Sequence, residues 1–88
     1  MIRTHNQAFG KALREFRKKR CLTQETLAFE AGLDRTYISV LELGRRSPTI
    51  DTLISLCEVL GISLVELAVR AQDLDESQND RNDHGPGP

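Results

Sequence analysis

The chain has 88 residues, of which 39% are hydrophobic and only 5% are aromatic. This length allows one small domain with a compact helical core and excludes an elaborate catalytic cleft. The net charge of −1 conceals an asymmetry, because residues 1–48 carry ten Lys or Arg against five Asp or Glu, whereas residues 49–88 carry two against eight. The basic half favours an anion-binding face, although two ordinary solvated surfaces would give the same counts.

Membrane, secreted and metal-binding classes find no support in the sequence. There is no apolar run of about 18 residues, which a transmembrane helix needs, and residues 1–10 have no signal-peptide core. Cys21 and Cys57 lie far apart, without a C-x-x-C motif or a histidine at ligand spacing. We therefore expect a cytoplasmic protein with no zinc site and no disulfide. We also expect no cofactor and no enzymatic activity, because no nucleophile–base or paired-carboxylate constellation can be placed in a cleft.

The first predicted helix covers about Gln7–Lys19 and follows a polar leader, residues 1–6, in which Asn6 is the expected N-cap. Its apolar residues have the spacing i, i+3, i+4, i+7 of a helix that buries one face: Phe9, Ala12, Leu13 and Phe16. Its other faces are basic and carry Lys11, Arg14, Lys18 and Lys19. These side chains form either a solvated surface or a set of phosphate contacts, and the sequence does not separate the two.

A tight corner between two short helices is predicted next. Thr23 is the N-cap of a helix at Gln24–Ala31, and Gly32 ends it, because glycine takes the left-handed conformation at low cost. Asp34 then caps a helix at about Arg35–Leu43. Two helices that cross through a turn of three to four residues need a small residue at the crossing, a glycine in the turn and a branched anchor. Those three residues are present as Ala28, Gly32 and Ile38.

A loop with two arginines leads to the fourth predicted helix. The loop, Gly44–Pro48, presents Arg45 and Arg46, whose charges suit contact with phosphates. Thr49 caps the helix Ile50–Leu60. Its expected apolar face consists of Ile50, Leu53, Leu56, Cys57 and Leu60.

Ser63 and Glu66 form a capping box for a fifth helix, from Leu64 to about Ala71. This helix has more apolar residues than one side of a short terminal helix can bury, and exposed apolar surface usually marks an interface. We therefore predict a two-fold dimer, whose contacts are Leu64, Val65, Ala68 and Val69. The alternative is that these residues all belong to the internal core. Residues 72–88 are acidic and polar, which predicts a disordered tail.

The corner and its flanks resemble the Cro- and XRE-type helix-turn-helix regulators. The matching residues are Thr23-Gln24-Glu25, Leu27-Ala28, Ala31-Gly32-Leu33, Tyr37-Ile38, Leu41-Glu42, Gly44 and Pro48-Thr49. The resemblance covers about Phe9–Ala71 and implies an all-α, five-helix, lambda-repressor-like DNA-binding domain at residues 7–71. The helix-turn-helix is formed by its second and third helices. The string Leu33–Ser39 is also similar to that of restriction–modification controller proteins, and a phage repressor or an antitoxin of the same fold stays open.

The resemblance implies that the third helix is a recognition helix lying in a major groove. Arg35 can then bind a guanine through two hydrogen bonds, and Thr36 and Val40 can meet a thymine methyl group. Ser39, one turn further along the same face, can bond a base or a phosphate. The predicted phosphate contacts are Gln24, Tyr37, Arg45 and Arg46.

In the family that the chain resembles, an arginine at the position of Arg17 pairs with a glutamate at the position of Glu42, so we predict a structural ion pair there. The predicted function is a sequence-specific transcriptional regulator that binds a pseudo-palindromic operator as a homodimer. Its expected partners are double-stranded DNA, a second copy of the chain and RNA polymerase, and it would associate with the nucleoid when bound. The alternative is a protein–protein interaction module of the same fold, such as an antitoxin, with weak or no specific DNA binding.

Overall fold

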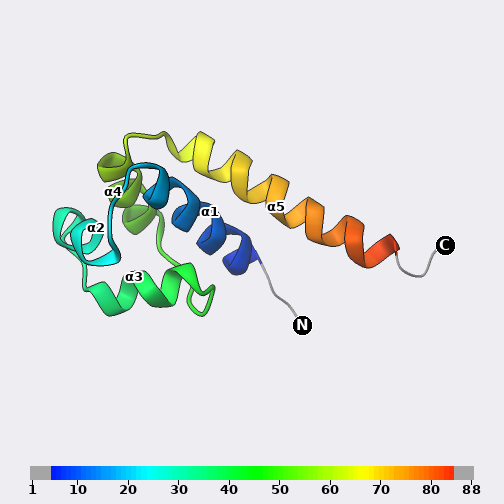
Figure 1. Ribbon diagram of the computed structural model, residues 1–88, viewed down its shortest axis with the longest axis horizontal. Helices are drawn as coiled ribbons and strands as arrows, with labels where there is room; N and C mark the ends of the chain where they lie inside the picture. Colours follow the sequence, from blue (N-terminus) through cyan, green and yellow to red (C-terminus); the bar gives the residue numbers. More distant parts are fainter. Residues whose placement is uncertain (1–4, 85–88) are drawn as a thin grey trace.

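The computed structural model describes residues 5–84, and every regular element in this part of the chain is a helix. The elements are α1 (His5–Lys19), α2 (Gln24–Ala31), α3 (Arg35–Glu42), α4 (Ile50–Leu60) and α5 (Leu64–His84) (Figure 1). The predicted all-α class with five helices is therefore confirmed.

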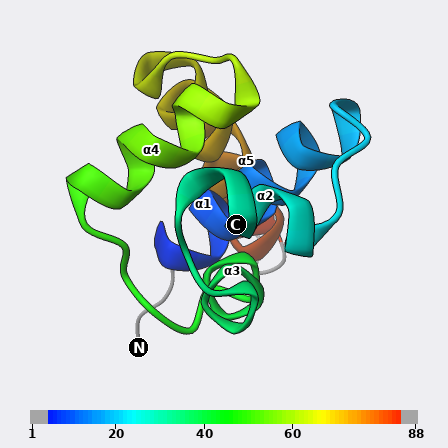
Figure 2. The same cartoon turned by 90° about the vertical axis from the view of Figure 1, so that its left-hand side faces the viewer.

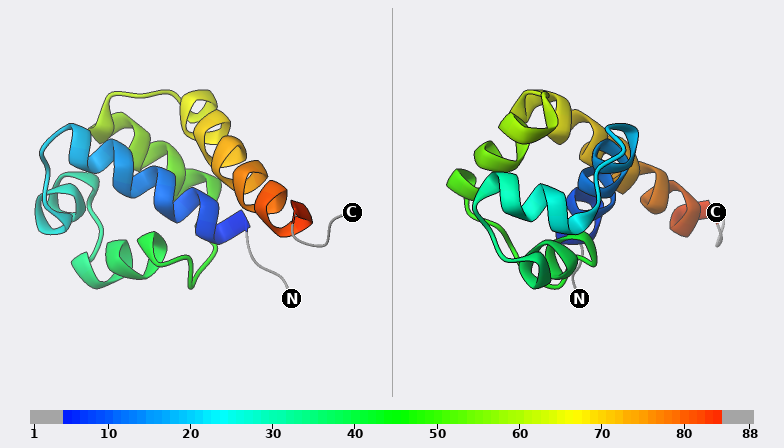
Figure 3. Two further views of the ribbon diagram at one scale, coloured as in Figure 1. Left: turned by 45° about the vertical axis from the view of Figure 1, so that its right-hand side comes forward. Right: turned by 60° about the vertical axis from the view of Figure 1, so that its left-hand side comes forward.

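Helix α1 is the centre of the arrangement. It packs against α5 on one side and against α3 on another, while α2 contacts both α3 and α4. Figure 2 shows α2 and α4 covering the end of this α1–α5 pair, with α3 at the lower edge. In Figure 3 the side of α3 that faces away from α1 and α2 is not covered by any helix of the described chain. The third helix is thus held at the periphery of the scaffold.

Two apolar clusters hold the helices together. The first joins the helices α1 to α4 through Leu13, Leu27, Ala28, Ile38, Leu41, Leu56 and Leu60. The second lies where α1, α4 and α5 meet and contains Ala8, Ala12, Leu53, Cys57, Leu67 and Ala71. Phe16 and Ile62 pack against both clusters. Each fully buried leucine contributes about 1.5–3 kcal/mol through removal of its surface from water, so this core provides most of the favourable energy of folding.

The N-caps predicted for the second to the fifth helix are present. The Thr23 hydroxyl accepts a hydrogen bond from the Thr26 N–H at 3.0 Å, and Asp34 Oδ1 accepts one from the Thr36 N–H at 2.9 Å. Ser63 and Glu66 complete their reciprocal capping box with two bonds of 3.0 Å. Gly32 takes a φ of +72° at the end of α2, so the left-handed turn needed for the corner is made by the expected residue.

The start of α1, the end of α3 and the exposure of Ile50 differ from the prediction. Helix α1 begins at His5, so Asn6 lies inside it instead of capping it, and residues 1–4 of the predicted leader lie outside the described residues. Helix α3 ends at Glu42, with Leu43 as its C-cap. Ile50 at the start of α4 is 59% exposed, because the first turn of that helix extends past the core.

The largest difference is at α5, which continues past the predicted end at Ala71 to His84. Residues 72–84, predicted as part of a disordered tail, therefore prolong the helix, and residues 85–88 lie outside the described residues. Leu74 packs against the second apolar cluster and fixes the next turn on α1. The next glycine or proline after Leu74 is Gly85, so this part of the chain contains no helix-breaking residue. Figure 1 shows its far end projecting beyond α1.

No single helix in the described part of the chain is both long and apolar enough to cross a membrane. Helix α4 and the Leu64–Asp75 part of α5 reach such a composition only as a pair bent by 102°. Both helices contribute apolar residues to the core clusters.

Candidate nucleic-acid interface

The outward face of α3 carries the four residues predicted to contact bases. Arg35 and Thr36 are exposed, and Ser39 and Val40 are half-buried one turn further on. On the opposite side Ile38 is completely buried, so the helix cannot rotate without exposing its anchor. This arrangement presents a narrow polar surface with one cation at its N-terminal end.

The predicted phosphate contacts Tyr37 and Arg46 lie together. The Arg46 guanidinium lies over the Tyr37 ring, 5.6 Å from its centroid, which is the geometry of a cation–π contact. The Tyr37 ring also packs against the first apolar cluster, so it links the loop after α3 to the core. Arg45 is exposed beside this pair. The structure thus places both arginines next to α3 and holds one of them in a defined position.

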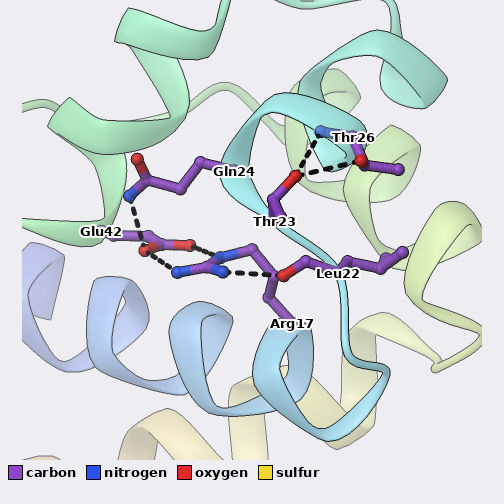
Figure 4. A network of polar contacts seen from close by, with 6 residues as sticks. All are labelled: Arg17, Leu22, Thr23, Gln24, Thr26 and Glu42. Atoms are coloured by element: carbon purple, nitrogen blue, oxygen red, sulfur yellow. Dashed lines mark hydrogen bonds and ion pairs between the residues drawn. The ribbon is translucent and has the colours of Figure 1, made fainter.

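A buried polar network fixes α3 to the scaffold (Figure 4). Arg17 Nε donates to Glu42 Oε2 at 2.6 Å, and Arg17 Nη2 donates to Glu42 Oε1 at 3.0 Å. A third donor, Nη1, bonds the Leu22 carbonyl at 2.8 Å. Both charged residues are 8% exposed, and the bond to Glu42 raises the pKa of Arg17 further above its ordinary value. The structure has the ion pair predicted from the sequence, and it joins α1 to the last turn of α3.

Gln24 belongs to the same network. Its Nε2 atom donates to Glu42 Oε1 at 3.0 Å, as Figure 4 shows, so the carboxylate is held from α1 and from α2 at once. This use of the side-chain donor was not foreseen from the sequence. As the first residue of α2, Gln24 has a backbone N–H among those that an α-helix leaves without an internal partner. A phosphate contact at this position, which stays a prediction, can use that group.

Two further residues that position the helices were not predicted from the sequence. A Cβ atom on Gly10 would collide with the carbonyl oxygens of Leu41 and Glu42, so the end of α3 lies directly on the α1 backbone. Arg20 donates from Nη1 to the Leu60 carbonyl at 2.8 Å and so caps the C-terminus of α4. The sequence offers no local signal for either contact, because both depend on how distant helices meet.

The four predicted dimer residues divide into two pairs. Val65 and Val69 are 70% and 53% exposed and lie one turn apart on α5. Leu64 is half-buried and packs against the second apolar cluster. Ala68 is half-buried and lines a surface hollow of about 490 Å³ between α5 and the start of α1. The two valines are therefore the residues most available to a partner.

The two cysteines differ sharply in accessibility. Cys57 is buried in the second cluster, and this burial, together with the nearby charge of Glu66, raises the pKa of its thiol. Cys21 is exposed at the corner between α1 and α2. Within residues 5–84 as described, no three His, Cys, Asp or Glu side chains are grouped so that they could hold a metal ion.

A family model described as helix-turn-helix matches residues 13–67, which include the corner and the Arg17–Glu42 ion pair. The chain belongs to the helix-turn-helix family. The resemblance to the Cro- and XRE-type regulators is thereby confirmed.

Known members of the family include regulators and controller proteins. The HTH-type transcriptional regulator y4dJ of Sinorhizobium fredii is 43% identical over 58 residues, which are 66% of this chain and 75% of that protein. The restriction–modification controller protein C.AhdI of Aeromonas hydrophila is 42% identical, with a TM-score of 0.69 over 70% of this chain and 94% of its own. The controller protein C.Esp1396I, solved as a tetramer with its natural 35-base-pair operator, is 29% identical, with a TM-score of 0.74 over 82% of this chain and 95% of its own.

Proposed function

We propose that this protein is a sequence-specific DNA-binding transcriptional regulator that binds a pseudo-palindromic operator as a homodimer. The observation that carries the proposal is the outward face of α3, which is polar, bears Arg35 at its start and is held at the edge of the scaffold. A helix presented in this way fits the major groove of B-DNA, which admits an α-helix. The assignment is to binding and not to catalysis.

The residues of α3 suit the reading of bases. Arg35 has the planar fork that bonds guanine O6 and N7 together. Thr36 adds a methyl and a hydroxyl group, while Ser39 and Val40 extend the same face by one turn. Tyr37, Arg45, Arg46 and the first turn of α2 flank this face, where they can contact phosphates and set the angle of docking.

One α3 helix can contact only a few base pairs, so the specificity of binding would come from the two α3 helices of a homodimer. Val65 and Val69 offer an exposed apolar strip on α5, and Leu64 and Ala68 border it. Two copies joined there would present two α3 helices to half-sites about 34 Å apart along the duplex. The oligomeric operator complex of C.Esp1396I supports this assembly for a relative of similar fold.

The proposal also includes RNA polymerase as a partner and the cytoplasm as the location of the protein. A regulator bound at a promoter acts on transcription by contacting the polymerase or by covering its binding site. Both routes place the protein on the nucleoid when it is bound to DNA.

The test is selection of bound sequences from a random duplex pool, using the full chain. We expect enrichment of a motif with dyad symmetry, with half-sites separated by about one helical turn of 10–10.5 base pairs. A pool that stays random, together with an affinity that hardly changes with salt, would overturn the proposal, because phosphate contacts make DNA binding strongly salt-dependent. That outcome would instead favour the protein–protein interaction module.

A further inference from the structure

A surface hollow of about 660 Å³ lies where the end of α1, the start of α2 and the start of α3 meet. Lys18 borders it from α1, Gln24 from the first residue of α2, and Arg35 from the first residue of α3. The hollow therefore adjoins the residue best suited to read a base. A duplex docked on α3 would run one of its strands past this place.

The charge of the hollow is positive. Arg17 also borders it, but its guanidinium is bound to the Glu42 carboxylate and brings no free charge. This leaves Lys18 and Arg35 against one acidic residue of the lining, Glu25. Because α2 begins here as well, the positive end of its dipole adds to the potential.

Lys18 and Lys19 are adjacent and equal in charge, but only Lys18 borders the hollow beside Arg35. The Lys19 ammonium lies over the Phe16 ring, 5.4 Å from its centroid. It borders a different hollow on the side of α5, together with Glu15, Arg70 and Lys18 itself. Lys19 does not line the hollow beside Arg35, which makes it a matched control for Lys18.

We propose that the hollow seats a backbone phosphate of the bound duplex and that Lys18 contacts this phosphate while Arg35 reaches the neighbouring base. The proposal rests on the DNA-binding function proposed above and adds a contact to it. Lys18 then contributes to affinity for all sequences and not to the choice of base.

The first experiment compares the salt dependence of binding to a short nonspecific duplex for the wild-type chain, Lys18→Ala and Lys19→Ala. We expect the slope of log K against log salt to fall by about one for Lys18→Ala, and by less than half of that for Lys19→Ala. Lys18→Arg should restore the wild-type slope, because the charge is kept. Equal slopes for the two alanine variants overturn this inference while leaving the DNA-binding function intact. A wild-type chain without salt-dependent affinity overturns the function itself.

The second experiment uses Cys21, which borders the same hollow and is exposed, as a chemical reporter. Alkylation of the wild-type chain with iodoacetamide is followed by mass spectrometry with and without the nonspecific duplex. We expect DNA to slow the reaction of Cys21 several-fold, while the buried Cys57 stays unreactive and confirms that the fold is intact. An unchanged rate at saturating DNA shows that no strand covers the hollow, and the inference fails.

Discussion

The Arg17 guanidinium binds the Glu42 carboxylate through two hydrogen bonds, of 2.6 Å and 3.0 Å, between α1 and the final residue of α3. Both residues are 8% exposed, so neither charge has water to stabilise it in the absence of the other. The C-terminal end of α3 is thus anchored by electrostatics, whereas Ile38 and Leu41 anchor the helix by apolar packing.

Glu42→Ala should lower the free energy of unfolding by about 3–5 kcal/mol, because it leaves a buried arginine without its partner. Unfolding in urea, followed by far-UV circular dichroism, measures the change. The double variant Arg17→Met with Glu42→Leu should recover most of this loss, since it removes both charges together. The exposed pair of Glu15 and Arg70 gives the contrast, because Arg70→Ala should cost far less. Equal costs for Glu42→Ala and Arg70→Ala would show that burial does not govern the pair.

Gly10→Ala should destabilise the protein, although the same change in most exposed helices stabilises by about 0.5–1 kcal/mol. The reason is that the added methyl group would collide with backbone carbonyls of Leu41 and Glu42, which cannot move aside as a side chain would. The urea midpoint should fall, whereas it should hardly change for Lys11→Ala at the exposed neighbouring position. A raised midpoint for Gly10→Ala would mean that α1 and α3 lie further apart than the structure places them.

Local signals explain what the sequence predicted correctly. Apolar periodicity locates the helices, and Thr23, Asp34 and Ser63 cap the helices that they were expected to cap. Gly32 could be predicted at the corner because its role depends only on its own left-handed backbone conformation and not on distant contacts. The outward face of α3 follows in turn, since burial of Ile38 determines which side chains remain outside.

The features that the sequence did not predict depend on tertiary contacts. The first added turn of α5 rests on the contact of Leu74 with the second cluster, whereas the acidic, polar composition of residues 72–88 alone suggested disorder. The bond from Gln24 to Glu42 joins residues 18 positions apart on different helices. Arg20, directly after α1, caps α4 through the Leu60 carbonyl, 40 positions further along the chain. The pattern of residues along the sequence contains no signal for contacts between such distant positions.

Arg35→Ala should cost about 1–3 kcal/mol in binding of the selected operator and should relax the preference at one base pair of each half-site. The physical reason is the loss of two hydrogen bonds to one guanine. Repeating the random-pool selection with the variant reads the preference directly. Arg45→Ala is the control, because loss of a phosphate contact should weaken binding without altering the motif. An unchanged motif for Arg35→Ala would remove this residue from base recognition.

Val65→Lys combined with Val69→Lys should convert the homodimer to a monomer. These side chains are the exposed apolar strip of α5, and burying two ammonium groups in an interface is costly. Sedimentation velocity gives the mass, and the melting temperature of the monomer shows whether the fold is kept. Phe29→Lys is the control, because Phe29 is 85% exposed on α2, away from α5. If the double variant and Phe29→Lys sediment alike, the dimer forms elsewhere.

Gln24→Ala should have two modest effects that can be measured separately. Loss of one hydrogen bond to Glu42 should lower the free energy of unfolding by about 1 kcal/mol, far less than Glu42→Ala, because both bonds from Arg17 remain. Binding should weaken by a similar factor for the selected operator and for a scrambled duplex, since a residue at the first turn of α2 meets the backbone and not the bases. Fluorescence anisotropy with the two duplexes makes the comparison. A loss confined to the operator would instead mean that Gln24 acts on base recognition, through the carboxylate that holds the end of α3.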